Sequence, residues 1–496
     1  MSKPFYSFCL FALLGVSSIF AKGQDIDATI EMDFKTPLIT VQGRHNARNS
    51  NRRNLSFLRT VAGADNLAGR ISGLSLRDSA NKPVSFKKLM DGEYLSEGDF
   101  DSWTYSVDLT PLKKPVAAAH ASWFADGTGI LMLADLLPLS GSSTNKPTAK
   151  ITFKTPRSFD LHPSQIYSAE RRRDDVFEVA DIEDAVFYVG WGWDHGLLLD
   201  KPMFSGSLLT SGTWNFDAYD VHPIAKEIQD YYLRLLGPHN SGPAFIAIAK
   251  FPMQTGPGEW QAETRGRNVM IISSDMPFRT QSLQRLHEQL RHELFHLWIP
   301  NGVNLTGNYD WFYEGFALYE SLKLAVALNR IRFEDFLDTL SRAHTIDSAG
   351  SQRTSLIQMS SNRFGGANTQ VYARGMLVAF LCDLALLQQS KGKRSVENIL
   401  NELFAKHRKP AEPADGNTAV LALLRSNPNV APIVDKYVTG ADKLEWTTDL
   451  AAAGIEDGDI GPNTTLRVKD KLNGRQKTLL DKLGYNNWRK LSVTSK

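Results

Sequence analysis

One stretch, residues 291–298, constrains this chain more than any other part of it. Its sequence is Arg-His-Glu-Leu-Phe-His-Leu-Trp, so His292 and His296 are four residues apart. On an α-helix, side chains at this spacing lie on one face, where two imidazoles can converge on one metal ion. Glu293 points to one side of such an ion and can take a proton from a bound water. We interpret the stretch as a zinc site in which Glu293 is the general base.

The residues before and within this stretch have the pattern of a helix that packs against a core. Pro300 ends the predicted helix. The two histidines project from the side opposite an apolar stripe, as a helix that carries a site requires. The stripe consists of leucines that recur at spacings of three and four: Leu283, Leu286, Leu290, Leu294 and Leu297.

A third metal ligand is predicted on a second helix. A catalytic zinc needs three protein ligands and an open fourth position. Glu314 follows His296 with seventeen residues between them, near the start of a helix predicted from Asp310. We therefore expect His292, His296 and Glu314 to hold one Zn²⁺ ion. Gly315 would allow the backbone of this second helix to approach the metal-binding helix closely.

Both motifs resemble those of the gluzincin zinc metallopeptidases. They are His-Glu-Leu-Phe-His-Leu-Trp at 292–298 and Trp-Phe-Tyr-Glu-Gly-Phe-Ala at 311–317. Trp298 makes the chain most similar to the glycyl aminopeptidase family, and Tyr372-Ala-Arg-Gly and Tyr437-Val-Thr-Gly extend that resemblance over residues 190–456. The spacing between the second histidine and the glutamate is nearer to that of the alanyl aminopeptidase and leukotriene hydrolase group, the near neighbour.

The resemblance implies roles for two further residues. Tyr372 would donate a hydrogen bond to the oxyanion of the tetrahedral intermediate, where a neutral donor stabilises charge that develops as water attacks. The alternative is a tyrosine of the core. Glu263 would bind the free amine of the substrate, and its alternative is an ordinary acid of a loop, with Glu259 as the fallback candidate.

Strands are predicted on both sides of the loop that carries Glu263, at 244–250 and 268–274. We expect the second strand to have a further use as an exposed edge of its sheet. Such an edge can align an extended peptide through backbone hydrogen bonds, which leaves specificity to side-chain pockets.

The N-terminal part of the chain is rich in alternating and β-branched runs. These runs predict strands separated by turn residues, and hence a β-sandwich-like domain; they lie at 28–40, 71–76, 103–109, 130–137 and 150–155. Trp191 and Trp193 follow them, and we favour a domain interface over a pocket for this pair because aromatic side chains dominate interfaces.

A chain of 496 residues is long enough for two or three domains. We predict a multidomain α+β fold in which the catalytic domain is thermolysin-like, as the resemblance implies. The predicted parts are an N-terminal β domain (24–205), the zinc catalytic domain (206–390), a C-terminal helical region (391–456) and a polar basic tail (457–496).

Residues 1–23 have the pattern of a secretory signal peptide. Lys3 precedes an apolar run at 5–20, and small residues flank Lys22. The run is shorter than the ~20 residues that span a bilayer, so we expect no stable membrane insertion after cleavage. The sequon at Asn304 lies so near the metal motifs that a glycan would obstruct substrate, which favours a bacterial periplasm. We therefore expect an exported protein, periplasmic or secreted.

Charge and cysteine content exclude several other classes of function. The formal net charge is +2, and without Lys3 and Lys22 of the leader it is zero, so we expect no nucleic-acid partner. Cys382 is the one cysteine outside the leader, so the mature chain relies on packing and metal in place of disulfides.

These observations predict an exported zinc metallopeptidase whose partner is a peptide substrate. We expect an aminopeptidase for peptides with small N-terminal residues, a preference implied by the resemblance. Two alternatives stay open: a zinc endopeptidase that acts on longer peptides, and a non-catalytic binding protein that retains the gluzincin fold. The presence of Glu293 beside all three ligands argues against the second. The sequence predicts no oligomeric state.

Overall fold

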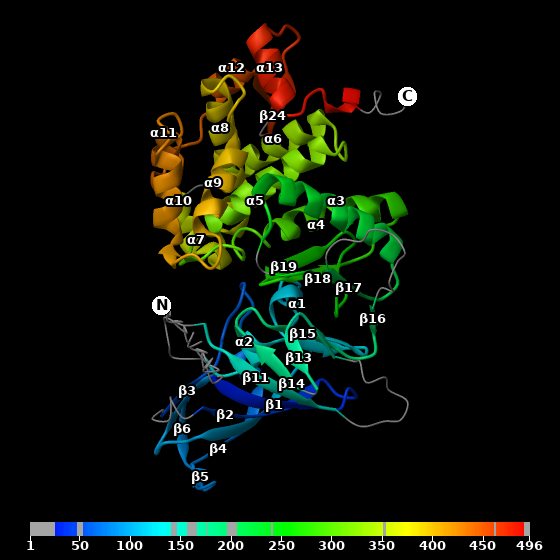
Figure 1. Cartoon of the computed structure of the whole chain (residues 1–496), viewed down its shortest axis with the longest axis vertical. Helices are drawn as coiled ribbons and strands as arrows, with labels where there is room; N and C mark the ends of the chain where they lie inside the picture. Colours follow the sequence, from blue (N-terminus) through cyan, green and yellow to red (C-terminus); the bar gives the residue numbers. More distant parts are fainter. Residues whose placement is uncertain are drawn as a thin grey trace, which may run out of the picture.

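The computed structural model describes residues 25–46, 53–139, 146–155, 166–174, 176–195, 206–239, 242–350, 354–460 and 463–490. The predicted leader lies outside these residues. In the described parts the chain stacks β-sheets at one end, a further sheet in the middle and helices at the other end (Figure 1). This is a multidomain α+β fold, as predicted.

The N-terminal part contains two large sheets and a small one. The eight-stranded sheet has the order β13-β14-β11-β1-β2-β8-β4-β5, and the four-stranded sheet has the order β12-β15-β10-β9. The first sheet comprises β1 (Ile26–Met32), β2 (Leu38–His45), β4 (Ile71–Arg77), β5 (Pro83–Val84), β8 (Ser102–Asp108), β11 (Ala149–Lys154), β13 (Arg171–Arg173) and β14 (Val176–Val179). The second comprises β9 (Trp123–Ala125), β10 (Thr128–Met132), β12 (Ile166–Ser168) and β15 (Val186–Val189). The small sheet comprises β3 (Asn54–Ser56), β6 (Phe86–Met90) and β7 (Glu93–Ser96).

The four-stranded sheet is buried on both faces, and its alternating side chains serve two different cores. Leu131 and Phe187 pack with the eight-stranded sheet, as in a β-sandwich. Ile130 and Tyr188, one residue away on the same strands, pack instead against the sheet that follows in the chain. Because side chains on a strand alternate in direction, two neighbouring strands can join both cores.

Two strands predicted for this region differ in the structure. The run at 28–40 forms β1 and β2, which are separated by a turn because the Asp33 carboxylate accepts hydrogen bonds from the backbone N–H groups of Lys35 and Thr36. The run at 130–137 ends as a strand at Met132 and continues as a single helical turn, α2 (Leu133–Leu136).

The middle sheet has five strands in the order β16-β17-β18-β20-β19. Its strands are β16 (Trp193–His195), β17 (Gly206–Ser211), β18 (Ala244–Lys250), β19 (Trp260–Arg265) and β20 (Asn268–Ser273). Since β16 belongs to it, this sheet begins before residue 206, the predicted start of the catalytic domain. Trp193 is buried in the core between this sheet and the four-stranded sheet, whereas Trp191 is 55% exposed.

The edge strand of this sheet is not the one that the sequence predicted. The segment with Glu263, expected to be a loop, is strand β19, which pairs along its length with β20. Strand β20 is therefore interior, between β18 and β19, and β19 takes the edge position. All six residues of β19 are half-buried, so it lacks the alternating burial by which a strand is recognised in sequence.

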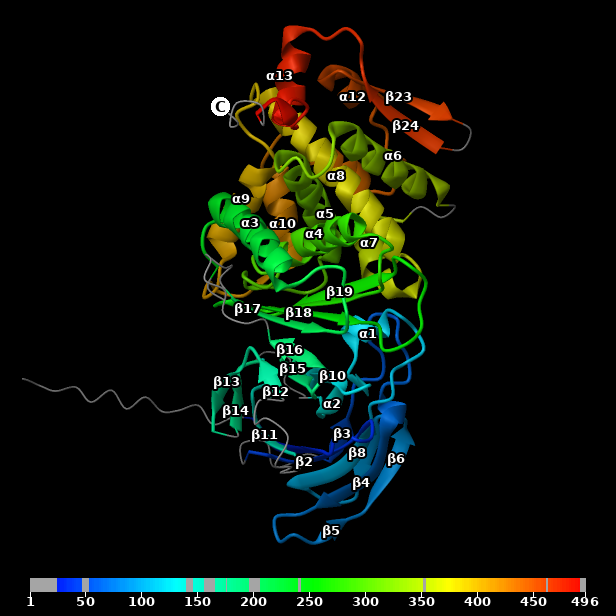
Figure 2. The same cartoon turned by 90° about the vertical axis from the view of Figure 1, so that its right-hand side faces the viewer.

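Helices cover the other face of the five-stranded sheet (Figure 2). The main ones are α3 (Ala218–Leu236), α4 (Arg279–Phe295), α5 (Asp310–Ala327), α6 (Phe333–Ala349), α7 (Leu356–Ser361), α8 (Asn368–Gln389) and α9 (Val396–His407). Among the described helices, α8 alone is long and apolar enough to cross a membrane, but 83% of its apolar window is buried inside the protein, as in the core helix of a globular domain.

Helices α5 and α8 cross at a pair of glycines. A Cβ atom on Gly315 would lie 2.4 Å from the backbone of Gly375, and one on Gly375 would lie 2.6 Å from the carbonyl oxygen of Trp311. Gly315 thus allows close approach to α8, and not to the helix of His292 (α4) as predicted. The crossing brings Glu314 on α5 and Tyr372 on α8 to the same place, because each lies within three residues of its glycine.

We expect Gly315→Ala to destabilise the protein by about 1–3 kcal/mol, because the added methyl group overlaps backbone that has no rotamer to change. The measurement is the denaturant midpoint of unfolding. The matched control is Gly474→Ala, because Gly474 is also in a helix but no atom lies within 4 Å of the added Cβ. This substitution should change stability little. Equal midpoints for the two variants would contradict this account of the crossing.

The C-terminal part is helical at first and then contains a hairpin. It comprises α10 (Gly416–Arg425), α11 (Ala431–Val434), α12 (Thr447–Ala453), β23 (Ile455–Ile460), β24 (Asn463–Val468) and α13 (Gly474–Lys482). Residues 457–490 of the segment predicted to be a polar tail are thus folded wherever they are described. Four of their leucines, Leu466, Leu479, Leu480 and Leu483, are buried in the core of the helical part.

Candidate active site

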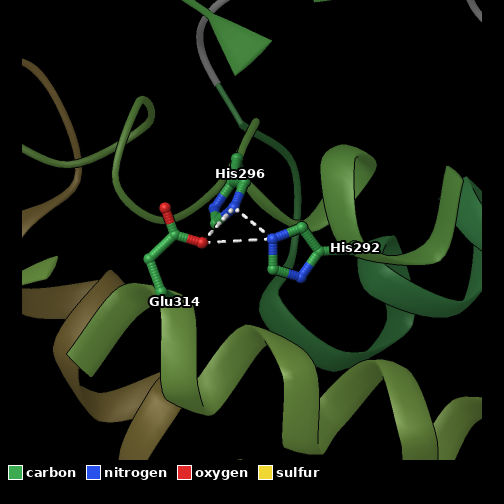
Figure 3. Close-up of side chains that lie close together, drawn as sticks. All are labelled: His292, His296 and Glu314. Carbon is green, nitrogen blue, oxygen red and sulfur yellow. Dashed lines mark hydrogen bonds and ion pairs between the residues drawn. The ribbon is translucent and has the colours of Figure 1, made fainter. Parts of the chain in front are cut away.

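Helix α4 and the turn after it position the two histidines, and helix α5 positions the glutamate. His292 lies in the last turn of α4, His296 caps that helix, and Glu314 lies one turn into α5. The three side chains point toward one another (Figure 3). The Nε2 atoms of His292 and His296 are 3.2 Å apart, and Glu314 Oε2 is 3.1 Å from the first and 3.5 Å from the second.

These three atoms fit a tetrahedral metal ion. Zinc lies about 2.0–2.2 Å from imidazole nitrogens and carboxylate oxygens, and in a tetrahedron this puts neighbouring ligand atoms about 3.3–3.6 Å apart. The observed triangle has edges of 3.1–3.5 Å. Two imidazole nitrogens and one carboxylate oxygen are also the donor set of a catalytic zinc with an open position. In the described part of the chain, this is the one cluster of such residues that could hold a metal ion.

The surroundings of His296 orient it for metal binding. Its Nδ1 atom lies 3.0 Å from the carbonyl oxygen of Ile299, to which it donates a hydrogen bond, so the lone pair of Nε2 is directed into the triangle. Burial by itself lowers the pKa of His296, but the hydrogen bond and charge of Glu314 raise it to about 9. The pocket therefore favours a cation at this position.

Glu293 is buried beside the triangle and is held by a residue of the edge strand. The hydroxyl of Thr264, on β19, lies 2.7 Å from Glu293 Oε2 and 3.0 Å from the Glu293 carbonyl oxygen. Burial raises the pKa of Glu293, and the nearby His292 and His296 offset this only in part. A buried carboxylate with a raised pKa suits proton transfer, although a divalent cation would oppose the shift.

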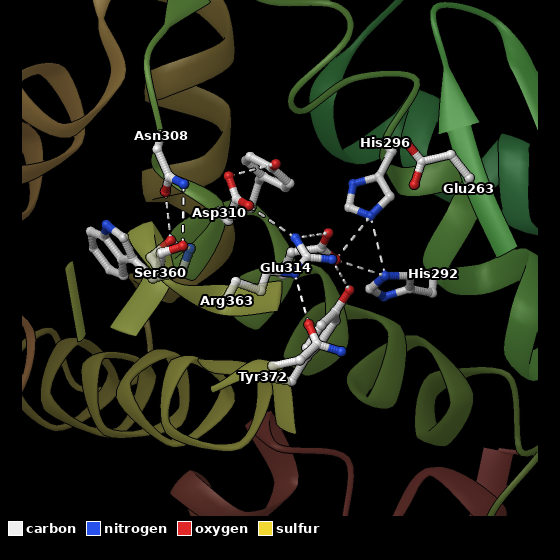
Figure 4. Close-up of polar contacts among 12 residues, drawn as sticks. Glu263, His292, His296, Asn308, Asp310, Glu314, Ser360, Arg363 and Tyr372 are labelled. Carbon is white, nitrogen blue, oxygen red and sulfur yellow. Dashed lines mark hydrogen bonds and ion pairs between the residues drawn. The ribbon is translucent and has the colours of Figure 1, made fainter. Parts of the chain in front are cut away.

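Tyr372 reaches the same place from helix α8. Figure 4 shows its hydroxyl beside Glu314 and the guanidinium group of Arg363. Burial and the Glu314 carboxylate raise the pKa of Tyr372 well above its usual value, and Arg363 only partly opposes this. The phenol therefore keeps its proton and can donate it in a hydrogen bond.

Glu263 lies on the edge strand, near His296 in Figure 4, and its partner comes from the N-terminal part. Its Oε2 atom is 3.2 Å from His120 Nδ1, and its Oε1 atom is 3.7 Å from Arg265 Nε. Burial raises the pKa of Glu263, but His120 and Arg265 together outweigh it, so the pKa lies below its usual value. Glu263 is thus a charged carboxylate close to the metal triangle.

The structure brings all the predicted site residues together: His292, Glu293, His296, Glu314, Tyr372 and Glu263. Glu259, the fallback candidate, is exposed. Sequence reasoning missed Thr264, His120 and Arg363. Thr264 follows Glu263 directly, so its position was a usable signal, whereas His120 and Arg363 belong to segments that carry no recognisable motif.

No family model matches the chain, and no curated protein matches it. Solved structures do match. An aminopeptidase N family protein from Idiomarina loihiensis has 15% sequence identity and a TM-score of 0.71, over 87% of this chain and 79% of that one. The chain has the fold of that protein.

Two other similar structures have bound molecules. A mutant of an M1 zinc metallopeptidase from Deinococcus radiodurans, bound to a Tyr-Ser-Ala substrate, has 12% identity and a TM-score of 0.51, over 84% of this chain and 94% of that one. Yeast LTA4 hydrolase in complex with bestatin has 14% identity and a TM-score of 0.50, over 86% and 67%. The names of these structures belong to the alanyl aminopeptidase and leukotriene hydrolase group. The sequence motifs resemble that group less than they resemble the glycyl aminopeptidase family.

Proposed function

We propose that this protein is a zinc metallopeptidase that removes N-terminal residues from peptides. The observation that carries the proposal is the triangle of His292, His296 and Glu314, with Glu293 buried beside it. The fold shared with zinc metallopeptidases supports it. The residues fit the ion, and when bound it would acidify a water molecule and polarise the substrate carbonyl.

The side chains of this chain divide the reaction among them. Glu293 removes a proton from the attacking water as the water oxygen bonds to the scissile carbonyl carbon. Tyr372 donates a hydrogen bond to the carbonyl oxygen while that oxygen carries negative charge. Glu293 then passes the proton to the amide nitrogen as the C–N bond breaks, which releases the new amine.

Two parts of strand β19 act on the substrate before the reaction. Its outer edge pairs with no strand in the described part of the chain and can take an extended peptide by backbone hydrogen bonds. The Glu263 carboxylate pairs with the substrate ammonium group, which selects peptides with a free N-terminus. A preference for small N-terminal residues belongs to the same proposal and rests on the resemblance to the glycyl aminopeptidase family.

One observation favours an endopeptidase as the second candidate. His120 and Arg265 both contact the Glu263 carboxylate. Because the negative charge of Glu263 already interacts with these two residues, its attraction for a substrate ammonium group is weaker. Hydrolysis of a free-amine peptide and of its N-acetylated twin separates the two candidates. An aminopeptidase cleaves only the first, an endopeptidase cleaves both, and a non-catalytic binding protein cleaves neither while it holds zinc.

Glu263→Gln gives a residue-level test of the amine site. We expect kcat/KM on free-amine peptides to fall about 10- to 100-fold, because a charge-assisted hydrogen bond contributes about 1.5–3 kcal/mol. The loss should appear mainly in KM. Glu259→Gln makes the same change at an exposed position only four residues away and should leave kinetics as in the wild type. If Glu259→Gln had the larger effect, the amine site would be assigned to the wrong carboxylate.

Export is part of the proposal, supported by the signal-like pattern of residues 1–23 and the single cysteine that follows it. Fractionation of cells that express the full chain, with N-terminal sequencing of the product, tests it. A cytoplasmic product that retains Lys3 would contradict export.

A further inference from the structure

Arg363 is buried at the metal centre although it belongs to neither of the helices that carry the ligands. It lies in the short segment Arg363–Gly365, between α7 and α8, and is 8% exposed. A buried arginine is costly unless its charge and its donors are matched. Its partners therefore indicate what it does.

The guanidinium group joins two members of the site at once. Its Nη1 atom donates to Glu314 Oε1 at 2.9 Å, and its Nη2 atom donates to the Tyr372 hydroxyl oxygen at 2.7 Å. Figure 4 shows it between these two side chains. Two further hydrogen bonds hold it there: Nη1 donates to Asp310 Oδ2 at 3.1 Å, and Nε donates to Asn368 Oδ1 at 2.8 Å.

The hydrogen-bonding capacity of arginine decides how each partner is oriented. A guanidinium group donates and never accepts. Tyr372 must therefore accept from Arg363 through a lone pair, and its own hydrogen is left for an acceptor on the metal side, where Glu314 and the substrate carbonyl compete for it. Arg363 also occupies Glu314 Oε1, so the oxygen that faces the imidazoles is Oε2.

We propose that Arg363 is a positioning residue that orients the third metal ligand and the oxyanion donor together. Through Glu314 it makes the carboxylate a one-oxygen ligand, and through Tyr372 it makes the phenol a donor toward the substrate oxygen. The Tyr372 half rests on the proposed function, whereas the Glu314 half requires only that the site binds zinc.

A closed network supports this role. Asp310 balances the charge of Arg363 and accepts a hydrogen bond from the Tyr313 hydroxyl at 2.8 Å. The Tyr313 ring packs against the imidazole of His296, with ring centroids 5.8 Å apart. Arg363 is thus connected to the metal centre on two sides, by way of Glu314 and by way of Asp310 and Tyr313.

Three variants at two positions test the two halves separately. They are Arg363→Met, Arg363→Lys and Tyr372→Phe, with each Arg363 variant also made in the Tyr372→Phe background. Zinc affinity is measured by competition with a chelating dye, and kcat is measured on a free-amine peptide at saturating zinc. Arg332→Met is the matched control, because Arg332 is exposed and paired with Asp335 outside the site.

For Arg363→Met, we expect the zinc Kd to rise about 10- to 100-fold in both backgrounds, as is usual when a partner of a metal ligand is lost. At saturating zinc, kcat should fall about 10-fold or more in the wild-type background. In the Tyr372→Phe background, the further loss in kcat should be less than about 3-fold, because the hydroxyl through which Arg363 acts is gone.

Arg363→Lys separates positioning from a merely structural ion pair. A lysine keeps the charge between Asp310 and Glu314 but lacks the planar fork that also reaches Tyr372. We expect its zinc Kd to stay within a few-fold of the wild-type value while kcat falls as in Arg363→Met. If Arg363→Met fails to fold, the kcat of Arg363→Lys still tests the proposed role of Arg363.

Three results would overturn the inference: an unchanged zinc Kd in folded Arg363→Met, a wild-type kcat in Arg363→Lys, or an equal loss of kcat in both Tyr372 backgrounds. Failure of the proposed function has a different signature. The wild-type protein would then hold zinc and hydrolyse no peptide, which removes the Tyr372 half, while the zinc Kd of Arg363→Met still decides the Glu314 half.

Discussion

Replacing Glu293 by glutamine should lower kcat for peptide hydrolysis by about 10²- to 10⁴-fold, the range that a general base contributes. The amide has the shape of the carboxylate but cannot accept the proton of the attacking water. It can still accept a hydrogen bond from the Thr264 hydroxyl, whose oxygen lies 2.7 Å from Glu293 Oε2, so the local structure should be kept. Zinc content should stay at one ion per chain, as measured by elemental analysis beside the kinetics.

Glu288→Gln is the control for this variant. Glu288 lies on the same helix, one and a half turns earlier, and its side chain is 52% exposed. The same chemical change there should leave both hydrolysis and zinc content as in the wild type. Normal peptide cleavage by Glu293→Gln would mean that another group takes the proton, and the proposed mechanism would be wrong.

Replacing His296 by alanine should remove both the metal and the activity. Two ligands, His292 and Glu314, would be left, which is too few for tight binding. The wild-type protein should gain about 4 kcal/mol of unfolding free energy when free zinc is ~1,000 times its Kd. The variant should show no such gain. Thermal unfolding with zinc and with a chelator measures the difference.

His195→Ala provides the matched comparison, because His195 is exposed on β16 and belongs to no cluster of metal-binding side chains in the described chain. Its melting temperature should respond to zinc as that of the wild type does. Retention of one zinc ion by His296→Ala would show that the triangle is not the binding site, and the enzymatic proposal would fail with it.

The local sequence pattern was sufficient to predict the residues of the candidate metal centre. His292, Glu293 and His296 lie within five residues of one helix, and the geometry of an α-helix decides which of their side chains share a face. Glu314 is on another helix, but the need of zinc for a third ligand and the motif around it identify this residue in the sequence. The predicted ligands form a triangle with edges of 3.1–3.5 Å.

Two parts of the fold could not be predicted from the local sequence pattern: strand β19 and the folded segment at 457–490. Strand β19 carries Glu263 and Thr264, yet every one of its residues is half-buried, so no alternation marks it as a strand. The segment at 457–490 is polar by composition, but its few leucines suffice to attach a hairpin and a helix to the core. Composition averages over residues, whereas packing depends on where each apolar side chain lies.

What the sequence by itself determined is the set of side chains at the candidate metal centre: two imidazoles, one carboxylate and the proposed base Glu293, each specified by helical spacing or by a short motif. The tertiary structure alone decided which groups surround them. His120 reaches Glu263 across 143 positions of the chain, and Arg363 reaches Glu314 across 49. No local periodicity encodes such contacts, because they depend on how sheets and helices stack, and here on the two glycines that let α5 and α8 meet.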